Sequence, residues 1–349
     1  MIVFRVDGNE KIGIGHIMRC LSIAEALRCR NQEIVFVLSD DRCVSLISQK
    51  QFKYEILNEN YTTMDSGMNT FIKIIDMYKP SVVVVDSYYV TYDFLSALRS
   101  FVIVAYLDDL LLYDYPVDIL INYNIYSELN DYRTLYKNSE TEPKYLLGPK
   151  YVPLRSEFTN CSKRNAIRDV KNILVSTGGA DPENVATSML SYIRNNFEKY
   201  EKFTFTFVVG SNNQHFERIH SLASELPNVE LRVNEKNMSG LMRKCDLAIS
   251  AAGSTLYELC VCGVPTITYV LADNQIRAAN AFFDRGVMSY IGDVRVEEDY
   301  LERMFGLINI LSDKQAIREA MISEGYKAVG ACGADNIAES LIEFLGGGC

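Results

Sequence analysis

The sequence predicts an α/β protein with two similar domains, each built on a doubly wound parallel sheet. Short apolar runs alternate with helical stretches along most of the chain, which is the pattern of such sheets. Several runs are almost wholly apolar, as is typical of parallel strands buried on both faces. The alternation restarts after residues 149–168, and 349 residues suffice for two domains of ~150 residues.

Six strands are predicted in the first half of the chain. They are Ile2–Val6, Glu33–Leu38, Lys53–Leu57, Ser81–Val85, Phe101–Tyr106 and Asp118–Ile121. Helices are expected between them, for example over Ile17–Arg28 and Met68–Tyr78, where apolar residues recur three and four positions apart. Pro80 follows the second of these helices and would stop it.

The second half repeats this order. Predicted strands are Ile173–Ser176, Phe203–Val209, Val229–Val233, Leu247–Ser250 and Thr266–Val270, and predicted helices include Asn184–Asn195, Ser254–Cys262 and Gln275–Asp284. We predict an N-terminal domain over residues 1–155 and a C-terminal domain over 165–330, with a last helix at about 331–345 that packs back on the first domain. Because ligands bind at the carboxyl ends of such strands, the facing strand ends should form a cleft.

Charge and cysteine content exclude several classes of function. Lys and Arg number 35 and Asp and Glu 45, a net charge of −10, which argues against a chain that coats nucleic acid or an anionic membrane. Nine cysteines occur without a C-x-x-C pair, so we expect reduced thiols in the cytoplasm. No apolar run reaches ~18 residues, so no membrane span is predicted. A monomer is expected.

The strongest local signal is the turn that precedes the first long helix. Gly13 and Gly15 allow a tight turn and a close approach to a ligand, and the helix that follows offers unpaired N–H groups to an anion. His16 stands at the start of that helix, where a neutral imidazole could take a proton from water or a sugar hydroxyl. The alternative is a histidine that only caps or packs the helix end.

A dinucleotide site competes for the same turn. Asp40 follows the second strand, about where a ribose-binding carboxylate belongs. The G-x-G-x-x-G pattern, however, needs a third glycine where Met18 stands. A long side chain there opposes close packing of helix on strand, so this interpretation is disfavoured.

Three turns of the second domain follow predicted strands and could contact a ligand. Ser176–Pro182 is rich in glycine, and Ser250–Glu258 leads small residues into a helix whose N–H groups would suit phosphate oxygens. Glu258 lies one turn inside that helix, where its carboxylate could accept ribose hydroxyls. The candidates in these turns and in Ala272–Gln275 are Gly178, Gly179, Gly253, Ser254, Thr255, Glu258, Asn274 and Gln275. Each turn could also be an ordinary strand-to-helix connection.

Lesser candidates follow strands of the first domain. Asp86 and Tyr88 come after one strand, and Asp108 and Asp109 after the next; such carboxylates contact ligands or cap helices. Arg155 follows Pro153 at the domain junction, where it could reach a ligand or remain in solvent.

These motifs resemble the UDP-sugar hydrolases of pseudaminic acid synthesis, which act on UDP-2,4-diacetamido-2,4,6-trideoxy-β-L-altropyranose. The resemblance spans almost the whole chain. It lies in Phe4–Gly8, Ile12–Leu21, Val85–Tyr88, Leu107–Leu110, Tyr151–Phe158, Ser176–Pro182, Ser250–Glu258 and Asp273–Gln275. The second half also resembles the nucleotide-binding domain of MurG-type glycosyltransferases of the GT-B group.

The resemblance implies a GT-B fold, with two Rossmann-like domains facing a cleft, and hydrolysis of the C1–O bond of a UDP-sugar with inversion. His16 matches the catalytic base, Gly15 lies near the diphosphate, Gly253–Thr255 match the diphosphate contact and Glu258 the ribose contact. The other candidate substrate contacts are Asp7, Gly13, Tyr88, Asp108, Arg155, Gly178, Gly179, Asn274 and Gln275. No metal or cofactor is expected. The product would feed nonulosonic acid synthesis and then surface glycans or flagellin.

One departure from the family pattern and three alternative functions remain to be considered. Val152–Leu154 departs from the family pattern and puts the orientation of Arg155 in doubt. Spore-coat polysaccharide proteins share the opening motif, so this motif does not by itself identify the sugar. A GT-B glycosyltransferase would use the same UDP-sugar donor, and a protein that binds a nucleotide sugar without turning it over is the third possibility.

Overall fold

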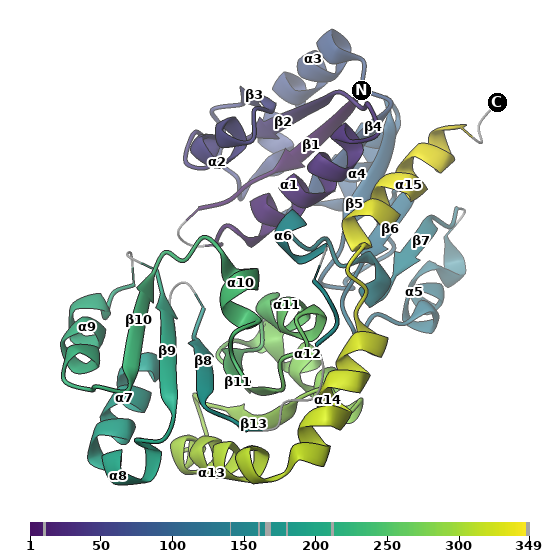
Figure 1. Ribbon diagram of the computed structural model, residues 1–349. Helices are drawn as coiled ribbons and strands as arrows, with labels where there is room; N and C mark the ends of the chain where they lie inside the picture. Colours follow the sequence, from purple (N-terminus) through teal and green to yellow (C-terminus); the bar gives the residue numbers. More distant parts are fainter. Residues whose placement is uncertain are drawn as a thin grey trace. The chain divides into compact units, whose positions relative to one another are not determined.

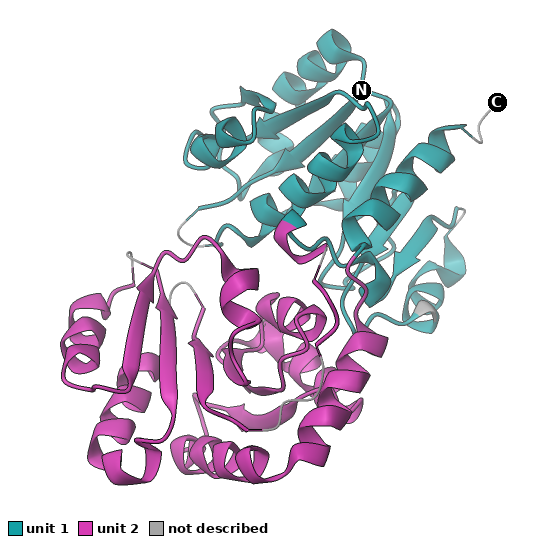
Figure 2. Ribbon diagram, in the orientation of Figure 1, with its two compact units in different colours: residues 1–156, 332–349 teal, residues 157–331 magenta. Residues whose placement is uncertain are grey.

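The computed structural model describes residues 1–9, 12–139, 141–159, 161–164, 169–178, 181–210 and 213–346. The chain divides into two compact units, shown in Figure 2. Unit 1 comprises residues 1–156 and 332–349, and unit 2 comprises residues 157–331. Each unit contains one parallel sheet with helices packed on it (Figure 1). The predicted α/β class is confirmed.

Unit 1 has a seven-stranded sheet in the order β3-β2-β1-β4-β5-β6-β7, and every adjacent pair is parallel. The strands are β1 (Ile2–Val6), β2 (Ile34–Leu38), β3 (Lys53–Ile56), β4 (Val82–Asp86), β5 (Ile103–Leu107), β6 (Ile119–Asn122) and β7 (Lys144–Leu147). The helices are α1 (Gly15–Arg28), α2 (Val44–Gln49), α3 (Met68–Tyr78), α4 (Tyr92–Arg99), α5 (Leu129–Leu135) and α15 (Gly333–Gly346), with short 3₁₀ turns η1 (Met64–Gly67), η2 (Tyr136–Asn138) and η3 (Pro149–Tyr151).

Unit 2 has a six-stranded parallel sheet in the order β10-β9-β8-β11-β12-β13. The strands are β8 (Asn172–Ser176), β9 (Thr204–Val209), β10 (Val229–Val233), β11 (Leu247–Ala251), β12 (Thr266–Val270) and β13 (Ser289–Asp293). The helices are α7 (Val185–Asn195), α8 (Phe197–Tyr200), α9 (Phe216–Ser224), α10 (Met238–Met242), α11 (Thr255–Val261), α12 (Asp273–Asp284), α13 (Tyr300–Asp313) and α14 (Gln315–Ala328); α6 (Ser156–Thr159) begins at the boundary.

The central strands show why these sequences form buried parallel sheets. All five residues of β1, β2 and β4 are buried, and the run of four valines in β4 fills both faces. The same pattern holds for β11 and β12 of unit 2. β-branched residues favour extended backbone, and burial on both faces requires the near absence of polar alternation.

In both sheets the strand order reverses beside the first strand. β1 pairs with β2 on one side and β4 on the other, with Ile2 opposite Ile34 and Val82. β8 lies in the same way between β9 and β11. The connections after the two strands that flank the reversal run in opposite directions and leave room at the carboxyl ends, which is where open α/β sheets bind ligands.

The strand predictions missed two elements and placed a third one residue too early. β7 and β13 were not predicted, and both are edge strands with mostly half-exposed residues, so they lack the apolar run of a central strand. Strand β4 extends to Asp86, which places that carboxylate at the last position of the strand instead of in the following loop.

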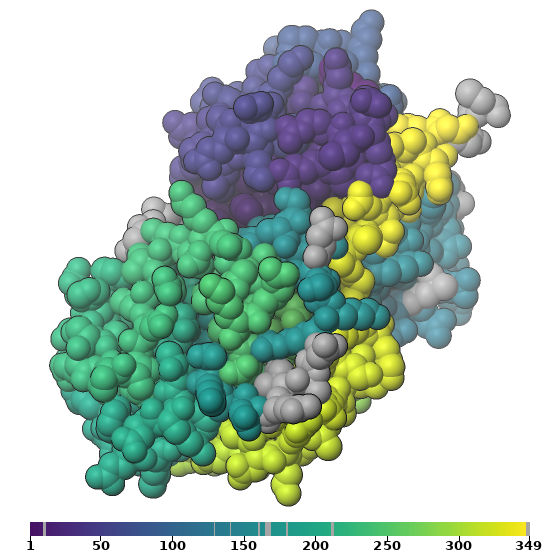
Figure 3. Space-filling view, viewed as in Figure 1, coloured from purple at the N-terminus to yellow at the C-terminus, as the bar shows by residue number. Residues whose placement is uncertain are grey.

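Helix α15 belongs to unit 1 and packs on α1 and η3. Its yellow surface lies against the purple surface of the N-terminal segment in Figure 3. Arg30, just after α1, forms ion pairs of 2.7 Å with both Asp335 and Glu339, and the Asn336 side chain donates a hydrogen bond of 2.6 Å to the Lys150 carbonyl.

Gly333 permits this packing because its backbone lies directly on the Val152 backbone. A Cβ at this glycine would stand 2.0 Å from the Val152 carbonyl oxygen, so a side chain would force the segments apart. We expect Gly333→Ala to lower the free energy of unfolding by about 1–3 kcal/mol. Urea denaturation measures this change. Gly346→Ala is the matched control in the same helix, since a Cβ there meets nothing within 4 Å; equal stability of the two variants would refute the argument.

Candidate active site

The candidate site of unit 1 lies where β1 and β4 meet at the reversal of strand order. The loop after β1 contains Gly13, whose φ of 75° suits glycine, and α1 then begins at Gly15. His16 is therefore in the first turn of α1, and Asp86 is the last residue of the neighbouring strand β4. Two segments that are 70 positions apart thus bring an imidazole and a carboxylate together.

His16 and Asp86 are buried, with 5% and 1% of their surface exposed. The Nδ1 atom of His16 lies 2.6 Å from Oδ1 of Asp86. The Arg19 Nη2 atom also lies 3.0 Å from Nδ1. Because the carboxylate can only accept and its contact is the shorter one, we assign the proton to Nδ1, which leaves the Nε2 lone pair available. Within the described residues, no hydrogen bond to Nε2 is formed. This arrangement is that of a general base held in one tautomer by a carboxylate.

Arg19, one helical turn beyond His16, holds the other side of Asp86. Its Nε atom donates to Oδ2 over 2.6 Å and its Nη2 atom to Oδ1 over 2.5 Å. The remaining nitrogen, Nη1, donates to Asp109 and to the Tyr123 hydroxyl, both at 2.8 Å. Such a two-pronged contact fixes the plane of a carboxylate as well as its charge. Arg19 therefore sets the orientation of Asp86 and, through it, of His16.

The charges of this cluster shift the pKa values of its members. Burial alone would raise the pKa of Asp86, but Arg19 and His16 outweigh it and hold the carboxyl well below its usual range. Burial alone would lower the pKa of Arg19, but Asp109 and Asp86 raise it instead. Asp86 therefore stays ionised at any physiological pH, as a partner of an imidazolium must.

Tyr88 borders the imidazole ring of His16. The Tyr88 ring meets the His16 ring edge to face, with centroids 4.5 Å apart and planes at 81°. Tyr88 is 36% exposed, so it lies at the solvent side of the imidazole. Partial burial and then the Asp109 charge raise the pKa of its hydroxyl, which therefore remains a hydrogen-bond donor near neutral pH.

Two predicted substrate contacts of unit 1 have their carboxylates engaged within the protein. Both oxygens of Asp7 accept hydrogen bonds from Ser39, and Arg5 also donates to one of them. Asp108 accepts from the backbone N–H groups of residues 110 and 111 and from the Tyr132 hydroxyl. Both residues are more than nine-tenths buried, so the roles that their contacts support are to fix strand ends and loops.

The other predicted residues of unit 1 lie at different depths. Gly13 and Gly15 are exposed beside His16, and Arg155 is half-buried after η3. No contact in the structure tests whether these residues bind a ligand, so their roles stay predictions.

In unit 2 the predicted residues lie at the carboxyl ends of β8, β11 and β12. Gly178 follows β8 with a φ of 83°, and Gly179 lies outside the described residues. Gly253 and Ser254 are exposed after β11, Thr255 begins α11, and half-buried Glu258 lies in that helix. Asn274 is exposed in the first turn of α12, whereas the Gln275 side chain accepts a hydrogen bond from the Leu271 N–H at 2.9 Å.

Arg19 and Tyr123 are site residues that the sequence analysis did not single out. The signal for Arg19 is its spacing of three from His16, which places both on one helix face. Asp86 and Asp109 were weighed only as general strand-end carboxylates. Tyr123 follows directly on β6, and nothing in its sequence context distinguishes it.

Two further searches concern metal sites and membrane spans. Among residues 1–9, 12–139 and the other described segments, no group of three or more His, Cys, Asp or Glu side chains is placed to hold a metal ion. Within the same part of the chain, every helix is too short or too polar to cross a membrane.

Comparison with known proteins agrees with this division of the chain. Residues 172–327 match the Glycosyltransferase family 28 C-terminal domain, and this segment lies within unit 2. The structure of MurG from Acinetobacter baumannii superposes with a TM-score of 0.68 at 13% identity, over 98% of this chain and 99% of that one. Staphylococcus aureus MnaA with UDP gives 0.69 at 13% identity, over 99% and 96%. The chain has the GT-B fold.

Three curated relatives match this chain at 25–30% identity. The uncharacterized protein MJ1062 of Methanocaldococcus jannaschii is 30% identical over 79% of this chain and 56% of its own length. Spore coat polysaccharide biosynthesis protein SpsG of Bacillus subtilis is 30% identical over 42% and 43%. The chain thus spans about half the length of these two relatives. The UDP-2,4-diacetamido-2,4,6-trideoxy-beta-L-altropyranose hydrolase of Campylobacter jejuni is 25% identical over 74% and 86%.

Proposed function

We propose that this protein is a hydrolase that releases UDP from a UDP-2,4-diacetamido-2,4,6-trideoxyhexose, the β-L-altropyranose, by attack of water at C1 with inversion. The observation that carries the proposal is the buried pair of His16 and Asp86 at the strand-order reversal of unit 1. The likeness to the Campylobacter jejuni hydrolase and the opening motif support the choice of reaction and sugar. The free sugar would then enter pseudaminic acid synthesis.

His16 acts as the general base in this proposal. Its Nε2 atom takes a proton from water as the water oxygen forms a bond to C1, on the face opposite the departing group. The C1–O bond breaks, and UDP leaves with the electron pair. The Nδ1–H group of His16 donates a hydrogen bond to the Asp86 carboxylate during the whole reaction, and the carboxylate stabilises the imidazolium that forms. Attack from the opposite face inverts C1.

Unit 2 holds the nucleotide in this proposal. Gly253–Thr255 contact the diphosphate and Glu258 accepts the ribose hydroxyls, as the resemblance implies. Backbone N–H groups that stabilise charge developing on the diphosphate lower the barrier to its departure. Diphosphate is a good leaving group, so no general acid is required on its side.

The test is incubation of the protein with the UDP-sugar and no acceptor. We expect stoichiometric release of UDP and of free sugar, with the inverted anomer first in the NMR time course before mutarotation equilibrates it. UDP release that requires an added acceptor would show a glycosyltransferase. Binding of the UDP-sugar without product over hours would show a nucleotide-sugar binding protein.

A glycosyltransferase is the second candidate, and one observation favours it. The match of residues 172–327 is to a glycosyltransferase family 28 domain, and this is the half of the chain to which we assign nucleotide binding. A match in this half supports a nucleotide-sugar donor. It does not distinguish transfer of the sugar to an acceptor from transfer to water. A related enzyme of surface or spore-coat polysaccharide synthesis, as SpsG is named, would differ in the sugar and is distinguished by a panel of UDP-diacetamido sugars.

A further inference from the structure

Two thiols of unit 2 lie in contact although they are 101 positions apart. The Sγ atoms of Cys161 and Cys262 are 3.7 Å from each other. Cys161 follows α6, and Cys262 is the residue that ends α11. Neither thiol takes part in the proposed hydrolysis.

The segment that contains Cys161 is fixed on both sides of that residue. Before it, the Glu157 carboxylate accepts a hydrogen bond of 3.0 Å from the Ser239 N–H. After it, the Arg164 N–H donates to the Tyr326 hydroxyl at 2.7 Å, and the Arg164 guanidinium contacts Asp246 and the Cys245 carbonyl. Anchors at both ends hold the Cys161 side chain close to Cys262.

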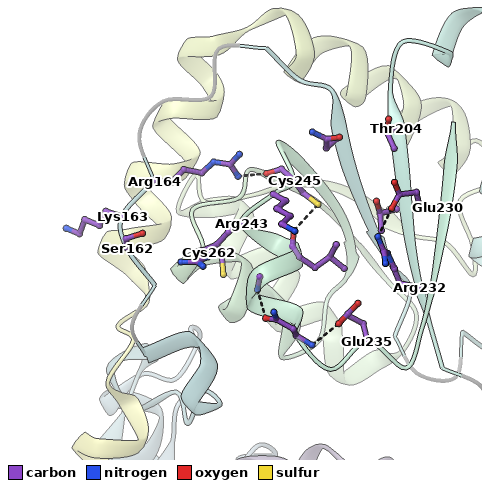
Figure 4. Close-up of a pocket in the computed structure, with 16 residues that line it drawn as sticks. Ser162, Lys163, Arg164, Thr204, Glu230, Arg232, Glu235, Arg243, Cys245 and Cys262 are labelled. Atoms are coloured by element: carbon purple, nitrogen blue, oxygen red, sulfur yellow. Dashed lines mark hydrogen bonds and ion pairs between the residues drawn. The ribbon is translucent and has the colours of Figure 1, made fainter.

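Cys262 lines a cavity of about 930 Å³ in unit 2 (Figure 4). Lys163, Arg164 and Arg243 lie around the same cavity as Cys262, but burial outweighs the nearby arginine and raises the pKa of the Cys262 thiol, which therefore keeps its proton near neutral pH. Cys161 is half-buried whereas Cys262 is 1% exposed. Cys161 is therefore the thiol that a small oxidant meets first.

We propose that Cys161 and Cys262 form a reversible disulfide in the presence of a hydroperoxide. The Cys161 sulfur gives up its thiol proton and attacks the terminal peroxide oxygen, the O–O bond breaks, and Cys161 becomes a sulfenic acid while the other oxygen leaves with that proton as water or alcohol. The Cys262 sulfur then displaces the sulfenyl hydroxyl, which leaves as water with the Cys262 proton. Two thiols are oxidised by two electrons and one hydroperoxide is reduced.

The geometry needs only a small adjustment for this bond. The two sulfurs must approach from 3.7 Å to about 2.0 Å, which side-chain rotation and a slight shift of the segment provide. The disulfide would close the chain from 161 to 262 into a loop and tie α6 to the end of α11. Cross-links across long loops stabilise the folded state, so unit 2 should become more resistant to heat.

The experiment treats the full chain with hydrogen peroxide and maps its peptides by mass spectrometry without reduction. We expect one linked pair of peptides that contains Cys161 and Cys262, an intact mass lower by two hydrogens, and full reversal by dithiothreitol. The melting temperature should rise by several degrees on oxidation. It should not rise in Cys161→Ser or in Cys262→Ser.

Cys29→Ser is the matched control, because Cys29 is an exposed cysteine of unit 1 and should leave the linked peptides unchanged. Recovery of Cys161 as sulfinic acid, or of Cys161 and Cys262 as unlinked thiols while Cys29 and Cys332 are oxidised, would overturn the proposal. Peptide mapping does not depend on turnover, so this result is independent of whether the protein is a hydrolase.

Discussion

Replacing His16 with alanine lowers the rate of UDP release from the UDP-sugar by about 10²–10⁴-fold, the usual contribution of a general base. Affinity for UDP should stay nearly unchanged, because the His16 side chain contacts water in this proposal, and Gly253–Thr255 and Glu258, which would hold the diphosphate and ribose, lie in unit 2. The rate is measured as kcat in the acceptor-free assay and UDP affinity by calorimetry. A fall in kcat without a change in binding is the mark of a group that acts in the transition state.

The chain offers its own control for this experiment. His220 is an exposed histidine on α9 in unit 2, so His220→Ala should leave kcat unchanged. His16→Ala with kcat close to wild type would remove His16 from the mechanism. Loss of both kcat and UDP binding would point to a damaged fold, which a melting curve would reveal.

Replacing Asp86 with asparagine has the second large effect, on both activity and stability. An amide at this position can donate to Nδ1 as well as accept, so the imidazole is no longer held with its proton on Nδ1 and the imidazolium loses its counter-charge. We expect kcat to fall by about 10²-fold or more. The change also leaves the Arg19 charge without its main buried partner, and losing one side of such a pair costs about 3–5 kcal/mol of unfolding free energy.

The lowered pKa of Asp86 also predicts the direction in which the free energy of unfolding changes with pH. The pKa of Asp86 is lowered in the folded protein from about 3.9 in the unfolded chain. Its stabilisation is therefore complete above about pH 4 and is lost as the pH falls toward the folded-state pKa. Urea unfolding between about pH 3 and about pH 7 should show this loss in the wild type and a flatter curve in Asp86→Asn. Asp76→Asn, an exposed substitution on α3, should reproduce the wild-type curve.

The central strands of each sheet can be predicted from the sequence because each consists of a short, continuous apolar run. The bounds of β1, β10, β12 and α3 agree with those predicted. Two edge strands, β3 and β10, are predicted because their apolar residues alternate, whereas the edge strands β7 and β13 are missed because their residues are mixed.

The sequence predicts the site residues that stand together in one backbone turn. It misses contacts between side chains that are distant in the chain. Gly13, Gly15 and His16 stand in one short motif that follows a strand. By contrast, the contacts of His16 with Asp86 and of Arg19 with Asp109 join helix α1 to the ends of β4 and β5, which come close to it only in the folded sheet. Strand order decides which strand-end carboxylate meets the histidine, and strand order is not encoded in any local stretch.

The return of α15 to α1 has a consequence for biosynthesis. Unit 1 is interrupted in sequence by the whole of unit 2, and the anchors of Arg30 to Asp335 and Glu339 exist only once the last helix leaves the ribosome. Domains tend to fold in the order of their synthesis. Here the later half can reach its native state while the earlier half still waits for its closing helix, so a nascent chain released before residue 333 would expose the apolar side of α1 to chaperones and proteases.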